Sequence, residues 1–177
     1  MKNEYRRIWL VAASTFGVTL LISGTTREFL GTISPFFSIL FLVIVILIGI
    51  LFDIIGTAVI SAHESTFHAM AAKQIFGANS AIRLVKRAGE VANFCNDLVG
   101  DIAGTLSGAM GAIVATSLGK PVLIAIMAPA VSTLTVVGKA LGKGPAIKYA
   151  DAIIYQVACI LAWWDKIFHG GKKRQRS

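Results

Sequence analysis

Residues 36–52 read FFSILFLVIVILIGILF, a block without a charged residue and with Ser38 as its one polar side chain. After Asp53 the uncharged stretch continues to residue 62, just before His63 and Glu64. As one helix, residues 36–62 would be roughly 40 Å long, enough to cross a hydrocarbon core of about 30 Å with some tilt. The stretch therefore predicts a transmembrane helix that carries an acid.

Four residues at the end of this stretch are predicted to share one helix face. Asp53, Thr57, Ser61 and Glu64 follow one another at i, i+4, i+8 and i+11. A carboxylate in an apolar span is costly and usually faces a bundle interior or a water-filled path. The stripe favours a polar path. The alternative is that Glu64 marks the cytosolic end of the span and Asp53 pairs with a neighbour.

The composition is that of a membrane protein, because 55% of the residues are hydrophobic and 15% are charged. The net charge of +8 comes from Lys and Arg that lie between hydrophobic spans. We therefore expect contact with membrane lipid and no nucleic-acid partner. The two cysteines, Cys95 and Cys159, show no metal or disulfide spacing and are predicted to be free thiols.

Four spans are predicted: residues 8–23, residues 36–62, a third within 91–118 and a fourth over 121–141. For the first span a cleaved signal peptide is the alternative, but its length and the missing A-x-A site favour a span. The expected fold class is an all-α membrane protein with four transmembrane helices and amphipathic juxtamembrane helices.

Basic residues predict the orientation. Of the 17 Lys and Arg residues, only Arg27 and Lys120 fall on one side of the predicted spans. The positive-inside rule then places both termini in the cytoplasm, in a multi-pass protein of the plasma membrane.

Residues 65–90 mix apolar and basic side chains and are predicted to lie at the cytosolic membrane surface. Gly77 is a candidate end of one helix there, and Asn79 or Ser80 a candidate cap of the next. Residues 152–164 (AIIYQVACILAWW) are also expected to be interfacial, because this apolar stretch is short for a crossing and ends in two tryptophans.

Glycines recur in the third predicted span. Gly100, Gly104 and Gly108 are spaced at i+4, and Gly111 continues the same side. Small residues at this spacing let two helices approach closely in lipid, so a packing face is the preferred interpretation.

The same span begins with polar side chains, and its Asp97 and Asp101 are four residues apart. The candidate metal ligands are Asp53, Ser61, Glu64, Asn96, Asp97 and Asp101. Oxygen-rich sets of this kind suit hard cations such as Mg²⁺. No nucleophile–base pair, phosphate loop or metalloprotease spacing is present in the sequence, so we expect no enzyme.

Three short motifs resemble those of the CorB/CorC and cyclin-M family of magnesium (and cobalt) transporters. Residues 61–65 (SAHES) look like the S-A-S-E-T motif that ends the first core helix of that family. Residues 94–100 (FCNDLVG) occupy the place of G-N-x-L-V-N, and residues 138–143 (GKALGK) stand in register with G-E-I-L-P-K. The resemblance covers residues 36–168 in order and spacing.

The resemblance implies a homodimeric transmembrane domain in residues 35–168 that binds Mg²⁺ between its first two core helices. The matching site positions are Ser61, Glu64 and Asn96. Residues 1–34 would add an N-terminal transmembrane helix with its outer loop. Residues 169–177 would be a basic cytosolic tail, held near anionic lipid by its charge.

The motifs also depart from the family pattern. Cys95 replaces the glycine of the second motif, and Gly100 replaces its last asparagine. Lys139 replaces the glutamate of the third motif. Asp97 and Asp101 are acids where the family tends to have neutral residues, so the cation site is interpreted as rebuilt.

Two functions therefore compete. The first is a divalent-cation (Mg²⁺) transporter-like protein that holds its ion between the second and third transmembrane helices. The second is a non-transporting partner or regulator that keeps the fold with a degenerate ion site. Its partner would be a transporter with paired nucleotide-binding CBS domains, or another membrane protein. We expect no CBS domains in this chain.

Overall fold

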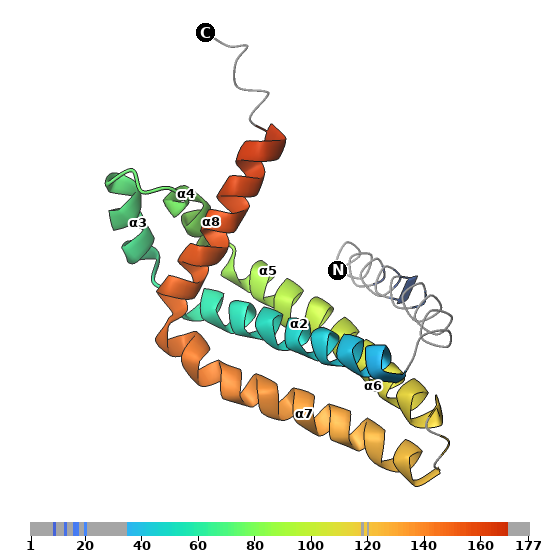
Figure 1. Ribbon diagram of the computed structural model, residues 1–177. Helices are drawn as coiled ribbons and strands as arrows, with labels where there is room; N and C mark the ends of the chain where they lie inside the picture. The colour runs from blue at the N-terminus through green and yellow to red at the C-terminus, as the bar shows by residue number, and fades with distance from the viewer. Residues whose placement is uncertain are drawn as a thin grey trace. The chain divides into compact units, whose positions relative to one another are not determined.

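The computed structural model describes residues 35–117, 119 and 121–169, together with the single positions Trp9, Ala13, Phe16, Gly17 and Leu20. Apart from those five positions, the predicted first span lies outside the described residues. The tail lies outside them from residue 170 on. The described part is all-α, as predicted (Figure 1).

Within these residues, three helices are long and apolar enough to cross a membrane: Phe36–Ser61, Ala88–Thr116 and Ala125–Lys148. The first is α2 (Pro35–Ser61), which confirms the predicted second span as a helix. The second is built from α5 (Ala88–Asn93), the π-helical segment η1 (Phe94–Val99) and α6 (Gly100–Ser117). The third belongs to α7 (Pro121–Lys148), which extends beyond the predicted end at residue 141.

Shorter helices form the segments predicted to be interfacial. They are α3 (Glu64–Ala72), α4 (Ala78–Lys86) and α8 (Ala150–His169). The prediction for Gly77 was wrong, because this residue is the N-cap of α4 with a φ of 83° rather than the end of α3. Its left-handed backbone is one that glycine adopts without strain. Asn79 and Ser80 therefore lie inside the first turn of α4 and do not cap it.

The chain divides into two compact units. The first, called the span unit here, consists of Met1–Phe52 and Leu98–Ala140. The second, called the junction unit, consists of Asp53–Asp97 and Leu141–Ser177. The core of the span unit is made by large apolar side chains of α2, α6 and α7, namely Leu42, Val45, Ile46, Met110 and Val131, with Ala103.

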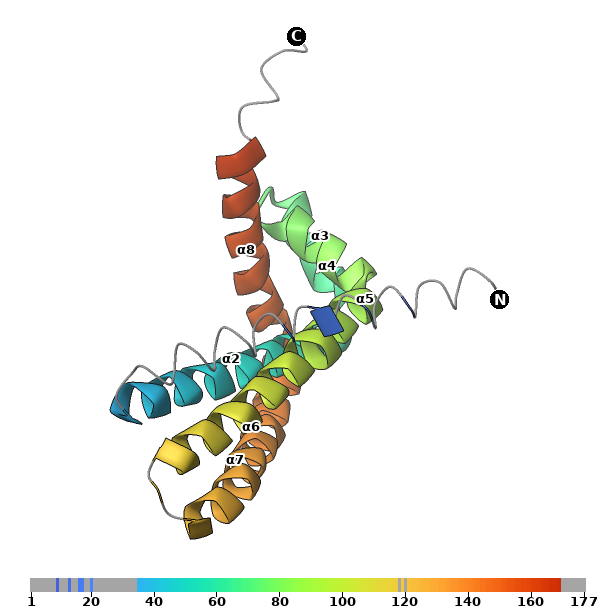
Figure 2. The same cartoon turned by 90° about the vertical axis from the view of Figure 1, so that its right-hand side faces the viewer.

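Glycines bring helices of the span unit close together at two points. A Cβ on Gly49 of α2 would lie 2.9 Å from the Ala103 Cβ of α6. A Cβ on Gly111 of α6 would lie 3.1 Å from Val131 Cγ2 of α7, so these two helices are close neighbours there (Figure 2). The predicted packing role thus holds for Gly111.

Gly104 and Gly108 do not pack in this way. A Cβ at either position would meet no heavy atom within 4 Å. Within the described residues of this chain these two glycines face no other helix, so a packing face at Gly104 and Gly108 stays a prediction. Both line an open groove of about 440 Å³, with polar side chains from α6 and α7: Asp101, Thr105, Ser107, Ser132, Thr135 and Lys139.

The junction unit has a core of small side chains. Its buried residues are Ala58, Val59, Phe67, Ala81, Ala92, Ala146, Ala150, Ile154 and Ala158. Small side chains let α4 pack closely against both α3 and α8 (Figure 1). At one such contact a Cβ on Gly77 would come within 2.8 Å of Cys159 Sγ. Cys159 and Cys95 are free thiols, as predicted.

Candidate cation site

The helix that carries Asn96 widens at that residue. The segment Phe94–Val99 is π-helical, between the α-helical turns of α5 and α6. Single π-helical turns inside α-helices are rare and occur frequently at functional sites. The sequence carried no sign of this turn, because six residues that read FCNDLV fit an α-helix as well as a π-helix.

Asn96 is pressed against the backbone of α2. A Cβ on Gly56 would overlap Asn96 Oδ1 and would lie 2.6 Å from Asn96 Cγ, so only glycine permits this approach. Asn96 Oδ1 is buried and has no hydrogen-bond partner among the described residues. A buried acceptor left in this state costs about 1–3 kcal/mol. An electropositive ligand would offset that cost.

Gly56 lies on the face of α2 that carries the predicted stripe. Asp53 precedes Gly56 by three residues, and Thr57 follows it directly, so all three occupy neighbouring positions on one side of the helix. Asp53 is 7% exposed. The structure therefore brings Asn96 to the side of α2 that bears a buried carboxylate. Sequence reasoning missed Gly56, although a glycine inside a long helix one turn from an acid was a visible signal.

Ser61 closes the stripe at the last residue of α2. Its hydroxyl donates a hydrogen bond to the Thr57 carbonyl oxygen at 3.1 Å. This bond uses the only proton of the hydroxyl and leaves oxygen lone pairs available as a neutral ligand.

Glu64 does not continue the stripe, contrary to the prediction. Helix α2 ends at Ser61, and Glu64 begins the separate helix α3 after the break at Ala62 and His63. Its Oε1 lies 3.0 Å from His68 Nε2 and 3.7 Å from Lys86 Nζ. The carboxylate is thus compensated within the junction unit by its own neighbours.

Asp97 and Asp101 are both exposed. Asp97 lies on the π-helical segment, and Asp101 lies in the first turn of α6, where it lines the groove of the span unit. Among the described residues, no three His, Cys, Asp or Glu side chains form a group that could hold a metal ion. A cation beside Asn96 would therefore rely on one carboxylate and several neutral oxygens.

The start of α3 is held by Asp151, a residue that sequence reasoning missed. Asp151 Oδ1 accepts a hydrogen bond from the His63 backbone N–H at 2.7 Å, and Oδ2 accepts one from Thr66 Oγ1 at 3.0 Å. The carboxylate satisfies a backbone donor at the helix N-terminus and complements the positive end of the helix dipole. An acid in the first turn of α8 was visible, but its partner 88 residues away was not.

Comparison with known proteins identified no relative of this chain. No family model matches the chain, and no curated protein and no solved structure is detectably similar to it. The candidate site is therefore argued from this chain's own geometry.

Proposed function

We propose that the chain is a multi-pass plasma-membrane protein that takes a divalent cation, Mg²⁺, as its substrate between α2 and η1. The observation that carries the proposal is the buried, unsatisfied Asn96 Oδ1, aimed at the face of α2 that bears Asp53. Both lie on helices long and apolar enough to cross a membrane.

The proposed ligands fit a hard cation. Asp53 supplies the negative charge, Asn96 Oδ1 a neutral oxygen, and the hydroxyls of Thr57 and Ser61 further neutral oxygens along the same face. Mg²⁺ is usually bound by one or two carboxylates while it keeps several waters, so a single protein carboxylate suffices. Glu64 is assigned to the edge of this path, because it begins the separate helix α3 and does not continue the face of α2.

The proposed topology follows from charge. With the predicted span at residues 8–23 counted, α2 enters the cytoplasm at Ser61, and α7 returns there at Lys148. Both termini then lie in the cytoplasm, as the positive-inside rule requires, and Lys120 is one of the few basic residues outside. The junction unit, with its basic α4, occupies the cytosolic face.

We also propose that a second copy of the chain covers the open groove of the span unit. Gly104 and Gly108 face space that another helix can fill, and small residues at this spacing promote close helix association in lipid. A second copy would also shield the polar side chains of the groove from lipid.

The second candidate is the non-transporting partner or regulator. Two observations favour it: Glu64 is paired with Lys86 and His68, and acidic clusters are absent from the described residues. It predicts membrane insertion and assembly without movement of ions.

Uptake of Mg²⁺ by the purified protein in liposomes separates the two candidates. The transport proposal expects uptake above that of empty liposomes, and a loss of at least about tenfold in Asp53→Asn because the only buried carboxylate of the site is neutralised. Asp165→Asn, which removes the same charge from an exposed position, is the matched control and should transport normally. Wild-type uptake equal to that of empty liposomes would favour the non-transporting candidate.

A further inference from the structure

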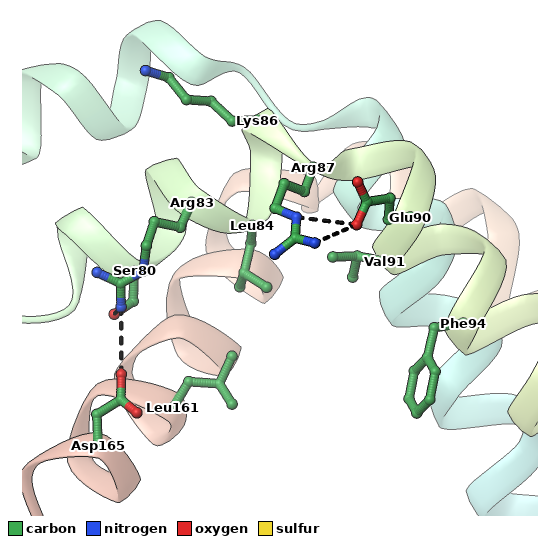
Figure 3. Close-up of a pocket in the computed structure, with 10 residues that line it drawn as sticks. All are labelled: Ser80, Arg83, Leu84, Lys86, Arg87, Glu90, Val91, Phe94, Leu161 and Asp165. Atoms are coloured by element: carbon green, nitrogen blue, oxygen red, sulfur yellow. Dashed lines mark hydrogen bonds and ion pairs between the residues drawn. The ribbon is translucent and has the colours of Figure 1, made fainter. Parts of the chain in front are cut away.

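The junction unit carries an open groove of about 800 Å³ that the cation site does not use (Figure 3). Helices α4, α5 and α8 contribute most of its lining. The basic lining residues are Arg83, Lys86 and Arg87; the apolar ones are Leu84, Val91, Phe94 and Leu161; the others are Ser80, Glu90 and Asp165. A volume of this size accommodates a sizeable part of an amphiphilic ligand.

The basic residues of the groove lie on α4 and at its C-cap, Arg87. Arg83 Nη2 lies 3.5 Å from Asp165 Oδ2, and Lys86 Nζ lies 3.7 Å from Glu64 Oε1. These ion pairs are long and solvent-exposed, and such pairs are weak, so both cations retain donors for another anion. Arg87 differs, because its Nε donates to Glu90 at 3.1 Å in a two-point pair (Figure 3).

Apolar side chains line the groove as well and are exposed, with Leu161 near Asp165 on α8 and Phe94 on the far side of α5 (Figure 3). Phe94 is 54% exposed and Leu161 is 43% exposed, although both are large hydrophobic side chains. Val91 and Phe94 belong to the candidate membrane span Ala88–Thr116. The groove therefore combines cations at α4 with apolar side chains of α8 and of the candidate span Ala88–Thr116.

We propose that this groove binds an anionic glycerophospholipid of the surrounding membrane. Arg83 holds the phosphate, and the flexible side chain of Lys86, whose ammonium points away from Arg83 in Figure 3, turns towards it. An acyl chain covers Val91, Phe94 and Leu161. The lining carries three basic and two acidic residues, which leaves one excess positive charge for a monoanionic headgroup. A free phosphate would leave the apolar half exposed, whereas a lipid covers it, and basic pockets at the cytoplasmic ends of spans bind such headgroups.

Binding to the full chain in detergent tests the proposal by native mass spectrometry, with phosphatidylglycerol and phosphatidylcholine of the same acyl chains. We expect the wild type to prefer phosphatidylglycerol, and the double variant Arg83→Gln/Lys86→Gln to bind it about tenfold more weakly. Lys73→Gln removes an exposed lysine outside the groove and is the matched control. Equal binding by the double variant and the wild type, or an equal loss in the control, would overturn the proposal.

Two further measurements identify the source of the phosphate and do not depend on a variant. Glycerol phosphate should fail to displace bound phosphatidylglycerol; displacement at matching concentrations would show that the apolar half contributes nothing. Phosphatidylglycerol with a photoreactive acyl chain should label the peptides that contain Phe94 and Leu161. Labelling spread evenly over α2, α6 and α7 would contradict a built site. The cation proposal is unaffected by either result, since its ligands lie outside the groove.

Discussion

In the span unit, long and branched side chains such as Leu42, Ile46 and Met110 fill the core, whereas alanines dominate the core of the junction unit. Side-chain hydrogen bonds follow the same division. Ser107 and Thr135 of the span unit donate to carbonyls of their own helices, as Ser61 of the junction unit also does. Only in the junction unit do acids, Asp151 and Asp165, reach other helices among the hydrogen bonds given above.

The difference is the one that we expect if lipid surrounds the span unit and water borders the junction unit. In lipid, apolar burial does not drive helices together, so close packing at small residues does, as at Gly49 and Gly111. At the membrane surface, short helices expose their backbone ends to water and are fixed by charged side chains that satisfy those ends. The Asn96–Gly56 contact is an exception in the junction unit, because there close packing leaves a polar atom unsatisfied.

The largest effect is expected from a bulky residue at a packed glycine. Gly111→Leu would push against Val131 and should destabilise the chain by about 2–3 kcal/mol through overpacking. Gly104→Leu is the matched variant at an open position and should leave monomer stability nearly unchanged. Thermal unfolding in detergent measures both, and equal destabilisation by the two variants would contradict the distinction between packed and open glycines.

Crosslinking in membranes then tests whether a second copy of the chain covers the groove of the span unit. Gly104→Leu should lower the yield of crosslinked dimer, because its side chain enters the proposed interface. An unchanged yield would remove the groove from the dimer interface.

A smaller effect is expected at the polar ties of the junction unit. Asp151→Ala removes the acceptor of the His63 N–H and should destabilise α3 by about 1–2 kcal/mol, in the range of a lost helix cap. Protease cleavage between α2 and α3 should become faster. Asp165→Ala removes only an exposed ion pair and should cleave as the wild type does; faster cleavage in both variants would show that the Asp151 contacts are not special.

The smallest effect concerns alkaline pH. A hydrogen bond with Cys159, and to a lesser degree burial, raise the pKa of Tyr155. The unfolded chain then loses the phenol proton first, near pH 10, so stability is complete below that pH and falls as pH rises above it. Tyr155→Phe should show a shallower loss of stability between about pH 9 and 11 than the wild type. Tyr149→Phe leaves the Tyr155–Cys159 pair intact and should follow the wild type.

The sequence predicted the apolar helices well and their connections poorly. Residues 36–62 were expected as a helix and Pro35–Ser61 is one, because an uncharged run of that length has few alternatives. The break after Ser61 was missed, since Glu64 continues the helical spacing. What ends the helix is the Asp151 carboxylate at the start of α3, a contact between distant parts of the chain.

The candidate site was predicted in part. Asp53 and Asn96 were selected from an intramembrane charge and from a family resemblance, and the structure places both in one unit. Gly56 was missed because its role depends on Asn96, a residue of another helix whose approach only the structure shows. The π-helical segment was missed because it leaves no periodic pattern in the sequence. Whether a cation binds there stays a prediction.

Mg²⁺-dependent thermal stabilisation of the full chain in detergent tests the central claim most directly, with Asn96→Ala compared with Asn93→Ala one turn earlier. A ligand that binds only the native state raises its stability, so millimolar Mg²⁺ should raise the Tm of the wild type and of Asn93→Ala. Asn96→Ala should lose most of that rise, and its Tm without Mg²⁺ should be no lower than that of the wild type, because the variant removes an unsatisfied buried oxygen. The account would be contradicted by a wild type whose Tm ignores Mg²⁺, or by an Asn96→Ala variant that is stabilised as much as the wild type.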